Sequence, residues 1–169
     1  MAMKMLAFSL MISSLLFSSC DVEHTVPVSE EMREKAYEIS FQYIGMPYVW
    51  GGASHYSDTG GGVDCSGLMI GIYDEVAENF SVDLPFEDAT ASAMANQYTI
   101  PLLEPERGGL IFMGEDGVVS HVALCHAVTD DTLVFLDAYS ISGEVGIRSY
   151  SLGDPRIISF GRMLVIEGF

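Results

Sequence analysis

A cysteine stands between an aspartate and a serine in the stretch "GGGVDCSGLMIGIY", residues 60–73. Asp64 is a residue type that favours the N-cap of a helix, and the apolar residues after it repeat with helical period. Cys65 would therefore lie in the first turn of a helix, where unpaired backbone N–H groups and the helix dipole favour a thiolate. A thiolate in that position is a nucleophile. A buried structural thiol and a disulfide with Cys125 are the alternatives.

A nucleophilic cysteine needs a base, and the base needs an orienting group. His121 lies in "VVSHVALC" and Asp137 in "TLVFLDAY", at equal distances from Thr129. A connecting loop with an odd number of residues would place the two side chains directly opposite each other, with Cβ atoms about 5 Å apart. His126 differs in parity from His121, which directs it to the other face and makes it the weaker base. The pattern predicts that Cys65 works with His121 and Asp137.

Helices are expected first along the chain and strands afterwards. Residues 29–45 predict a helix with Ser29 as N-cap, a second helix follows Asp64, and residues 88–97 predict a short third one. From residue 109 the pattern changes to short apolar runs separated by turn residues, which is typical of an antiparallel meander. The apolar stripe of the first helix consists of Met32, Ala36, Ile39 and Tyr43. The strand-like runs are 109–113, 118–125, 132–139, 146–150 and 162–166. This order indicates an α+β fold.

Composition restricts the class of protein. The chain has 169 residues, of which 49% are hydrophobic and 18% charged, which fits one globular domain. Its formal net charge is −17, and its seven Lys and Arg residues are scattered. Nucleic acid is excluded as a partner, because no basic stripe could neutralise phosphates.

The first twenty residues, "MAMKMLAFSLMISSLLFSSC", have the pattern of an export signal, with one Lys and then an uncharged apolar run. That run, residues 5–19, is shorter than the ~20 residues a bilayer requires. Small residues directly before Cys20 resemble the lipobox of bacterial lipoproteins, although Phe17 stands where leucine is usual. We expect residues 1–19 to be a signal peptide and residues 20–28 a polar tether lipidated at Cys20, which would anchor the protein in a membrane of the bacterial cell envelope. Simple secretion and a transmembrane anchor are the alternatives.

An ordered set of short motifs resembles the NlpC family of bacterial cell-wall peptidases. The motifs are "PYVWGG" at 47–52, "DCSGL" at 64–68, "LP" at 84–85, "GLIF" at 109–112 and "SHVAL" at 120–124. The resemblance covers nearly the whole chain after the tether. It implies a papain-like catalytic domain over residues 29–169, with the nucleophile at the start of a helix packed on a small antiparallel sheet. It also implies a cysteine endopeptidase of peptidoglycan stem peptides, typically cutting between γ-D-glutamate and the diamino acid, without cofactor or metal.

The resemblance assigns roles by position. It implies Cys65 as the nucleophile, His121 as the base and Asp137 as the third polar residue. It also implies that Tyr48 lines the site near the oxyanion. Histidine is frequent at the third position of this family, but a carboxylate orients an imidazole well and stabilises its cation.

Two neighbours of the cysteine have more than one interpretation. Asp64 is either the N-cap or, as in related enzymes, a ligand of the substrate's amine, and Ser66 is similarly ambiguous. Two further departures from the family pattern bear on the site: Gly109 replaces the usual acidic residue, and the segment 53–61 is longer than the usual connection. The longer segment could remodel the rim of the cleft and change substrate choice.

Other classes of function remain open. The same fold could serve a non-catalytic peptidoglycan-binding lipoprotein, or an amidase or acyltransferase. Cys65, His121 and Asp137 are also acceptable zinc ligands, although no CxxC or HxxxH spacing supports a metal site.

The predicted lipidation can be tested at Cys20. We expect Cys20→Ala to release the protein from membranes, because the acyl chains would have no attachment site. Membrane fractionation and the mass of the mature chain measure location and acylation together. Wild-type protein recovered soluble and without acyl chains would rule lipidation out.

Overall fold

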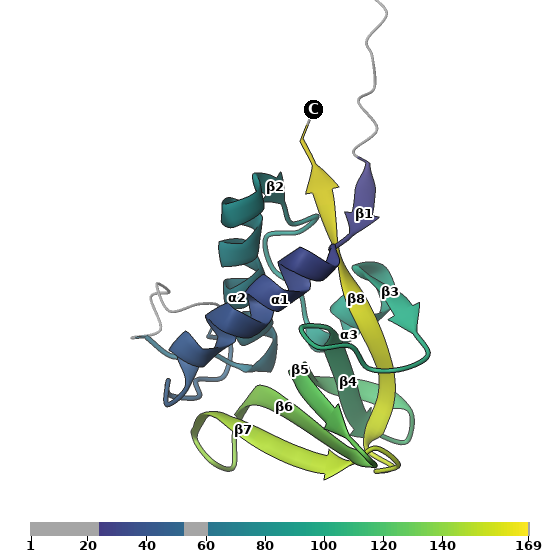
Figure 1. Cartoon of the computed structure of the whole chain (residues 1–169). Helices are drawn as coiled ribbons and strands as arrows, with labels where there is room; N and C mark the ends of the chain where they lie inside the picture. Colours follow the sequence, from purple (N-terminus) through teal and green to yellow (C-terminus); the bar gives the residue numbers. More distant parts are fainter. Residues whose placement is uncertain (1–23, 53–60, 169) are drawn as a thin grey trace, which may run out of the picture.

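The computed structural model describes residues 24–52 and 61–168 (Figure 1). The expected signal peptide, Cys20 and residues 53–60 of the long segment before the cysteine lie outside this part of the chain. Within it, the three α-helices precede the main strands along the chain, and the strands pair antiparallel. The predicted α+β fold is confirmed.

Each α-helix begins at a side-chain cap. Ser29, Asp64 and Thr90 accept hydrogen bonds from backbone N–H groups three residues along, at 3.2, 2.8 and 3.2 Å. These bonds satisfy N–H groups that have no partner within the helix. The helices are α1 (Glu30–Ser40), α2 (Cys65–Phe80) and α3 (Ala91–Gln97), with a 3₁₀ turn, η1 (Phe41–Tyr43), after α1. The predicted stripe of Met32, Ala36, Ile39 and Tyr43 is buried. The predicted caps at Ser29 and Asp64 are confirmed.

The main strands coincide with the five predicted runs. They are β4 (Leu110–Glu115), β5 (Val118–Thr129), β6 (Thr132–Tyr139), β7 (Glu144–Ser151) and β8 (Ile157–Glu167). Three short strands were not expected: β1 (Thr25–Pro27), β2 (Val82–Asp83) and β3 (Thr99–Leu102). All three pair with β8, which supplies backbone donors and acceptors that such short segments cannot find locally. Because β1 is part of the sheet, residues 25–27 of the expected tether are built into the fold.

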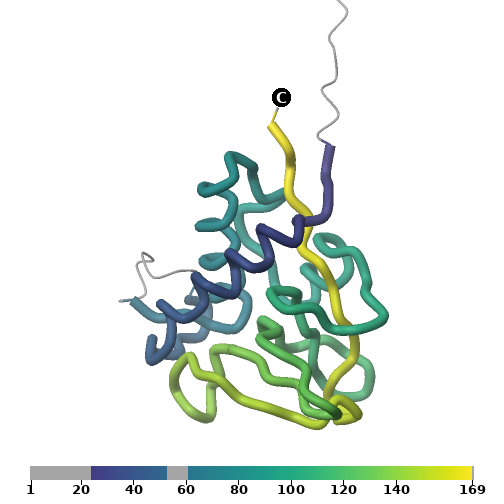
Figure 2. The backbone as a smooth tube through the Cα atoms, viewed as in Figure 1, coloured from purple at the N-terminus to yellow at the C-terminus, as the bar shows by residue number. Residues whose placement is uncertain are grey.

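The sheet is not a simple meander. Its order is β1-β8-β4-β5-β6-β7, so β4 to β7 follow one another, but β8 returns to pair with the other edge of β4. In Figure 2 the C-terminal strand runs the length of the molecule, with the N-terminal strand beside its end. The return of β8 closes an edge of β4 that would otherwise expose unpaired backbone groups.

Both faces of the central strands are covered. The larger core packs α1, α2 and α3 against alternate residues of the sheet, including Leu110, Val122 and Leu136. The residues between them point to a second, smaller cluster, which contains Ile111, Met113, Ala123, Cys125, Leu133 and Phe135. Figure 1 shows α1 and α2 crossing on one side of the sheet, above β6 and β7.

The register between β5 and β6 differs from the expected one. The strands join at a two-residue turn, with Thr129 opposite Thr132, rather than through an odd loop centred on Thr129. An irregularity between Cys125 and Ala127 then shifts the register by one residue, so that Leu124 lies opposite Leu136. Continuing this register places Asp137 opposite residue 123, two positions from His121. The expectation that His121 and Asp137 lie directly opposite each other is therefore wrong. A two-residue turn alone would put them on opposite faces of the sheet, but the extra residue in β5 returns them to the same face.

The extra residue at this irregularity is His126. Its side chain points to α1, where its Nε2 lies 2.9 Å from Oγ of Ser40 and its ring packs edge-on against Tyr37. Burial lowers the pKa of His126 to about 4. The expectation that His126 points away from His121 agrees with these contacts.

The buried histidine makes stability depend on pH. Because the folded pKa of about 4 lies below the value of an exposed histidine, the unfolded chain binds more protons between about pH 6.5 and pH 4. Its contribution is therefore complete above pH 6.5 and is lost as the pH falls. The wild-type protein should lose free energy of unfolding between pH 7 and pH 4.5. We expect this loss to be roughly 2 kcal/mol smaller in His126→Gln, measured by urea denaturation at both pH values. The matched substitution at the exposed His24 should leave that loss unchanged, and an unchanged loss in His126→Gln would contradict the assignment.

Candidate active site

Cys65 is the first residue of α2, and its neighbours hold the helix start in place. Oδ1 of Asp64 accepts hydrogen bonds from the Gly67 N–H at 2.8 Å and from the Ser66 hydroxyl at 2.9 Å. Oδ2 of the same carboxylate accepts from the Gly51 N–H at 3.1 Å. The cap therefore ties α2 to the preceding loop, and it occupies both Asp64 oxygens and the Ser66 hydroxyl.

The loop that carries Tyr48 is joined to the strand-like segment before the cysteine. Val49 donates to the carbonyl of Val63 at 3.0 Å, and Val63 donates to that of Pro47 at 3.1 Å. The approach is so close that a Cβ on Gly62 would lie 2.3 Å from the Val49 side chain. Glycine is therefore required at position 62 for packing.

Tyr48 lies beside the helix start. Its backbone N–H donates to the Gly143 carbonyl at 2.8 Å, which fixes the loop against the turn between β6 and β7. Burial first, and then the negative charges of Cys65 and Asp64, raise the pKa of Tyr48. Its phenol therefore stays protonated as a hydrogen-bond donor near Cys65.

His121 and Asp137 form a close pair. Nε2 of His121, on β5, lies 2.5 Å from Oδ2 of Asp137, on β6. The Asp137 side chain has no exposed surface, whereas the His121 side chain is 22% exposed. Because Nε2 faces the carboxylate, Nδ1 is the ring nitrogen left for Cys65, which lies close enough to raise the pKa of the imidazole. The structure thus brings together the three residues that the sequence singled out.

Two opposed effects act on the imidazole. Burial alone would lower the pKa of His121, but hydrogen bonds to Asp137 and Cys65, together with their charges, raise it to about 9. At neutral pH the ring is therefore protonated, and the imidazolium lies against the Asp137 carboxylate. This arrangement stabilises a thiolate and imidazolium pair, which is the reactive form of a cysteine nucleophile.

Arg148, on β7, is the site residue that the sequence reasoning missed. Its Nε donates to Oδ1 of Asp137 at 2.8 Å, and its Nη2 contacts Oδ2. Its guanidinium also lies over the Tyr139 ring, 3.6 Å from the centroid. As part of the strand-like run 146–150, Arg148 is expected on the same face as Tyr150, but nothing in this run names Asp137 as a partner.

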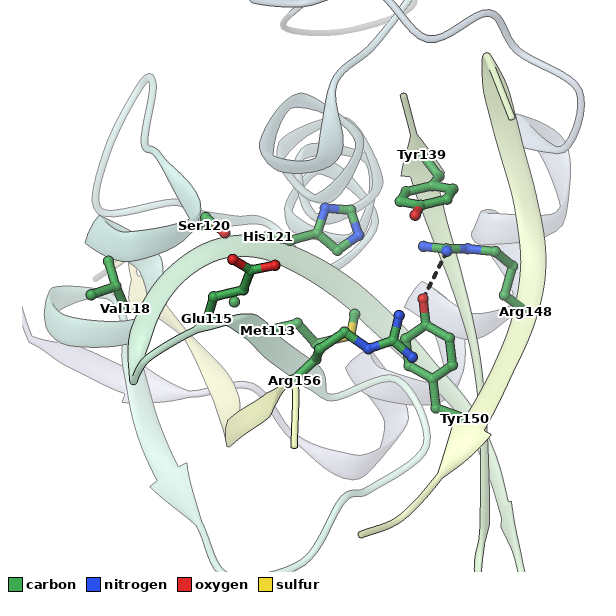
Figure 3. A pocket seen from close by; sticks show the side chains of 10 residues that line it. Met113, Glu115, Val118, Ser120, His121, Tyr139, Arg148, Tyr150 and Arg156 are labelled. Atoms are coloured by element: carbon green, nitrogen blue, oxygen red, sulfur yellow. Dashed lines mark hydrogen bonds between the residues drawn. The ribbon is translucent and has the colours of Figure 1, made fainter. Parts of the chain in front are cut away.

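Two cavities are lined by residues of this region. One, of about 370 Å³, is lined by His121, Tyr139, Arg148 and Tyr150 among others (Figure 3). The other, of about 230 Å³, is lined by Asp64, Ser66 and the largely exposed Trp50 among others.

The remaining alternatives for the cysteines and for a metal can be compared with the structure. Cys65 and Cys125 are both free, so the alternative of a disulfide between them is wrong. Cys125 is buried in the smaller core cluster, away from the helix start.

Within residues 24–52 and 61–168, no group of three or more His, Cys, Asp or Glu side chains could hold a metal ion. In the same part of the chain, no helix has the length and apolar character needed to cross a membrane.

Residues 45–154 match the model of the NlpC/P60 family. The chain belongs to the NlpC/P60 family. This assigns the domain to the cysteine-type cell-wall peptidases and confirms the resemblance drawn from the sequence motifs.

This NlpC/P60 chain is similar to a curated enzyme, the gamma-D-glutamyl-L-lysine dipeptidyl-peptidase of Bacillus subtilis. The two are 34% identical over 104 residues, which cover 59% of this chain and 31% of the relative. The chain thus matches less than a third of that relative's length.

Solved NlpC/P60 structures share the fold. NlpC1 of Trichomonas vaginalis is 20% identical with a TM-score of 0.58, over 80% of this chain and 45% of that one. A lipoprotein-like NLP/P60 protein of Staphylococcus aureus is 24% identical with a TM-score of 0.52, over 85% of this chain and 44% of that one. The papain-like α+β fold expected for the NlpC/P60 domain is therefore confirmed.

Cys65 and Cys125 should differ in reactivity. We expect iodoacetamide at pH 7 to modify Cys65 rapidly and to leave Cys125 unmodified in the folded protein. Cys65 faces an imidazolium at a helix start, whereas burial raises the pKa of the Cys125 thiol to about 12. Peptide mass spectrometry measures both sites, and the urea-unfolded chain, in which both should react, is the control. Faster labelling of Cys125 than of Cys65 in the folded state would contradict this assignment.

Proposed function

We propose that this chain hydrolyses peptidoglycan stem peptides at the bond between γ-D-glutamate and the diamino acid. The observation that carries the proposal is the close pair of His121 and Asp137, together with the effect of Cys65 that raises the pKa of the same imidazole. The family supports the class of substrate, and the Bacillus subtilis relative, by its name, supports the γ-D-glutamyl bond. The diamino acid itself stays open between lysine and diaminopimelate.

The proposed reaction begins with acylation. His121 holds the proton of Cys65, and the thiolate attacks the γ-carbonyl carbon, forming an S–C bond as the carbonyl becomes an oxyanion. In this proposal the Cys65 backbone N–H at the start of α2 and the Tyr48 hydroxyl, which stays protonated, stabilise that oxyanion. Collapse of the intermediate breaks the C–N bond, and the leaving amine takes the proton from His121.

Deacylation returns the enzyme to its starting state. Water attacks the thioester carbon, His121 takes a proton from that water, and the C–S bond breaks to release the acid product and the thiolate. Asp137 keeps Nε2 of His121 engaged throughout, so that Nδ1 remains the nitrogen that exchanges the proton. The acyl part of the peptide would lie in the cavity beside Asp64 and Ser66, and the amine part in the cavity beside His121.

The place of action follows from the N-terminal sequence. We propose that the protein is an exported lipoprotein, held by acyl chains on Cys20 at a membrane of the cell envelope. Anchoring there would keep the domain next to its peptidoglycan substrate.

Digestion of purified peptidoglycan tests the proposed reaction. We expect new fragments that end in γ-D-glutamate and fragments that begin with the free diamino acid, identified by mass spectrometry. Cys65→Ala should reduce turnover by more than about 10⁴-fold while leaving the thermal unfolding midpoint within a few degrees of wild type, because the thioester cannot form.

Other products would identify the other functions. Cleavage between the lactyl group and L-alanine would indicate an amidase, and intact stem peptides with retained binding would indicate a non-catalytic domain. Either result, obtained with folded wild-type protein, would overturn the proposal.

A further inference from the structure

The guanidinium of Arg148 is fixed from several sides. Besides its two contacts to Asp137, its Nη1 donates to the Tyr150 hydroxyl at 3.0 Å. Figure 3 shows it between the Tyr139 ring and the Tyr150 hydroxyl, at the wall of the cavity beside His121. Its side chain is only 21% exposed. A side chain as flexible as arginine therefore presents one fixed fork to the carboxylate.

The forked contact from Arg148 compensates for the burial of the Asp137 carboxylate. Asp137 has no exposed surface, and a buried carboxylate is costly unless it is paired and hydrogen-bonded. His121 approaches only Oδ2, whereas Arg148 reaches both Oδ1 and Oδ2. When His121 gives its proton to the leaving amine, the imidazole becomes neutral, and among the described residues Arg148 is then the one cation against Asp137.

We propose that Arg148 is a positioning residue of this site: it holds the Asp137 carboxylate oriented toward Nε2 of His121 through the whole reaction cycle. The charges support this role. With the thiolate, the imidazolium, the carboxylate and the guanidinium, the group of four is neutral, whereas the three predicted residues alone would carry one net negative charge. The inference rests on the proposed function for its catalytic meaning, but the contact itself acts on His121 and Cys65 whatever the substrate.

A double-mutant cycle tests the proposal without a substrate. The readout is the rate of Cys65 alkylation by iodoacetamide at pH 7 in wild type, Arg148→Leu, Asp137→Asn and the double variant. We expect Arg148→Leu and Asp137→Asn each to slow alkylation by at least about 10-fold. The double variant should be no slower than Asp137→Asn alone, because Arg148 acts through Asp137. Additive losses, or a wild-type rate in Arg148→Leu, would overturn the proposal.

Spectroscopy and a matched control separate positioning from general stability. The hydrogen bond from Nε2–H of His121 to Asp137 should give a downfield proton resonance that is lost in both single variants. Arg162 makes a comparable forked contact to Glu106 and has a side chain 26% exposed. Arg162→Leu should keep both the resonance and the alkylation rate. If Arg148→Leu does not fold, Arg148→Lys replaces it in the cycle, with partial rescue of the rate and the same non-additivity expected.

Peptide hydrolysis then distinguishes the two proposals. Loss of kcat with little change in KM in Arg148→Leu supports both. If stem peptides are not cleaved but the alkylation cycle is non-additive, the positioning role stands and the proposed substrate falls. If they are cleaved and the rate of Cys65 alkylation is unchanged in Arg148→Leu, the proposed substrate stands and the positioning role falls.

Discussion

A carboxylate without exposed surface is the constraint around which this site is arranged. Asp137 cannot remain charged in the sheet unless donors reach it, and they come from the two neighbouring strands, His121 of β5 and Arg148 of β7. The pairing of three strands is therefore coupled to one cluster of charges. The same contact that makes the buried charge tolerable also fixes which nitrogen of the imidazole is free to face Cys65.

Cys65, the proposed nucleophile, is positioned by contacts that are mostly local. Asp64 caps the helix that begins at Cys65 and binds Ser66, Gly67 and Gly51 with its two oxygens. Since those oxygens are engaged, the N-cap interpretation of Asp64 is the one that its contacts support. A substrate amine that approaches this carboxylate would have to share it with the cap.

The two halves of the site meet because β5 contains one extra residue. A two-residue turn alone would have put Asp137 on the face opposite to His121, and the irregularity at His126 reverses that outcome. His126 itself is held against α1 by Ser40 and Tyr37. The packing of α1 on the sheet thus holds His126, the extra residue that brings His121 and Asp137 to the same face of the sheet.

The sequence by itself determined the helices, the five long strands, the cap at Asp64 and the identity of Cys65, His121 and Asp137. These depend on periodicity, on turn residues and on short motifs, all of which are local properties of the chain. Only the tertiary structure decided the pairing of β8 with β4, the three short strands along β8 and the register of β5 and β6. It also decided that Arg148 joins the site. These features depend on which strand edges and which buried charges meet between residues far apart in the sequence. A buried carboxylate pairs with whichever cation lies near it in space, and no pattern in the sequence around Asp137 indicates that cation.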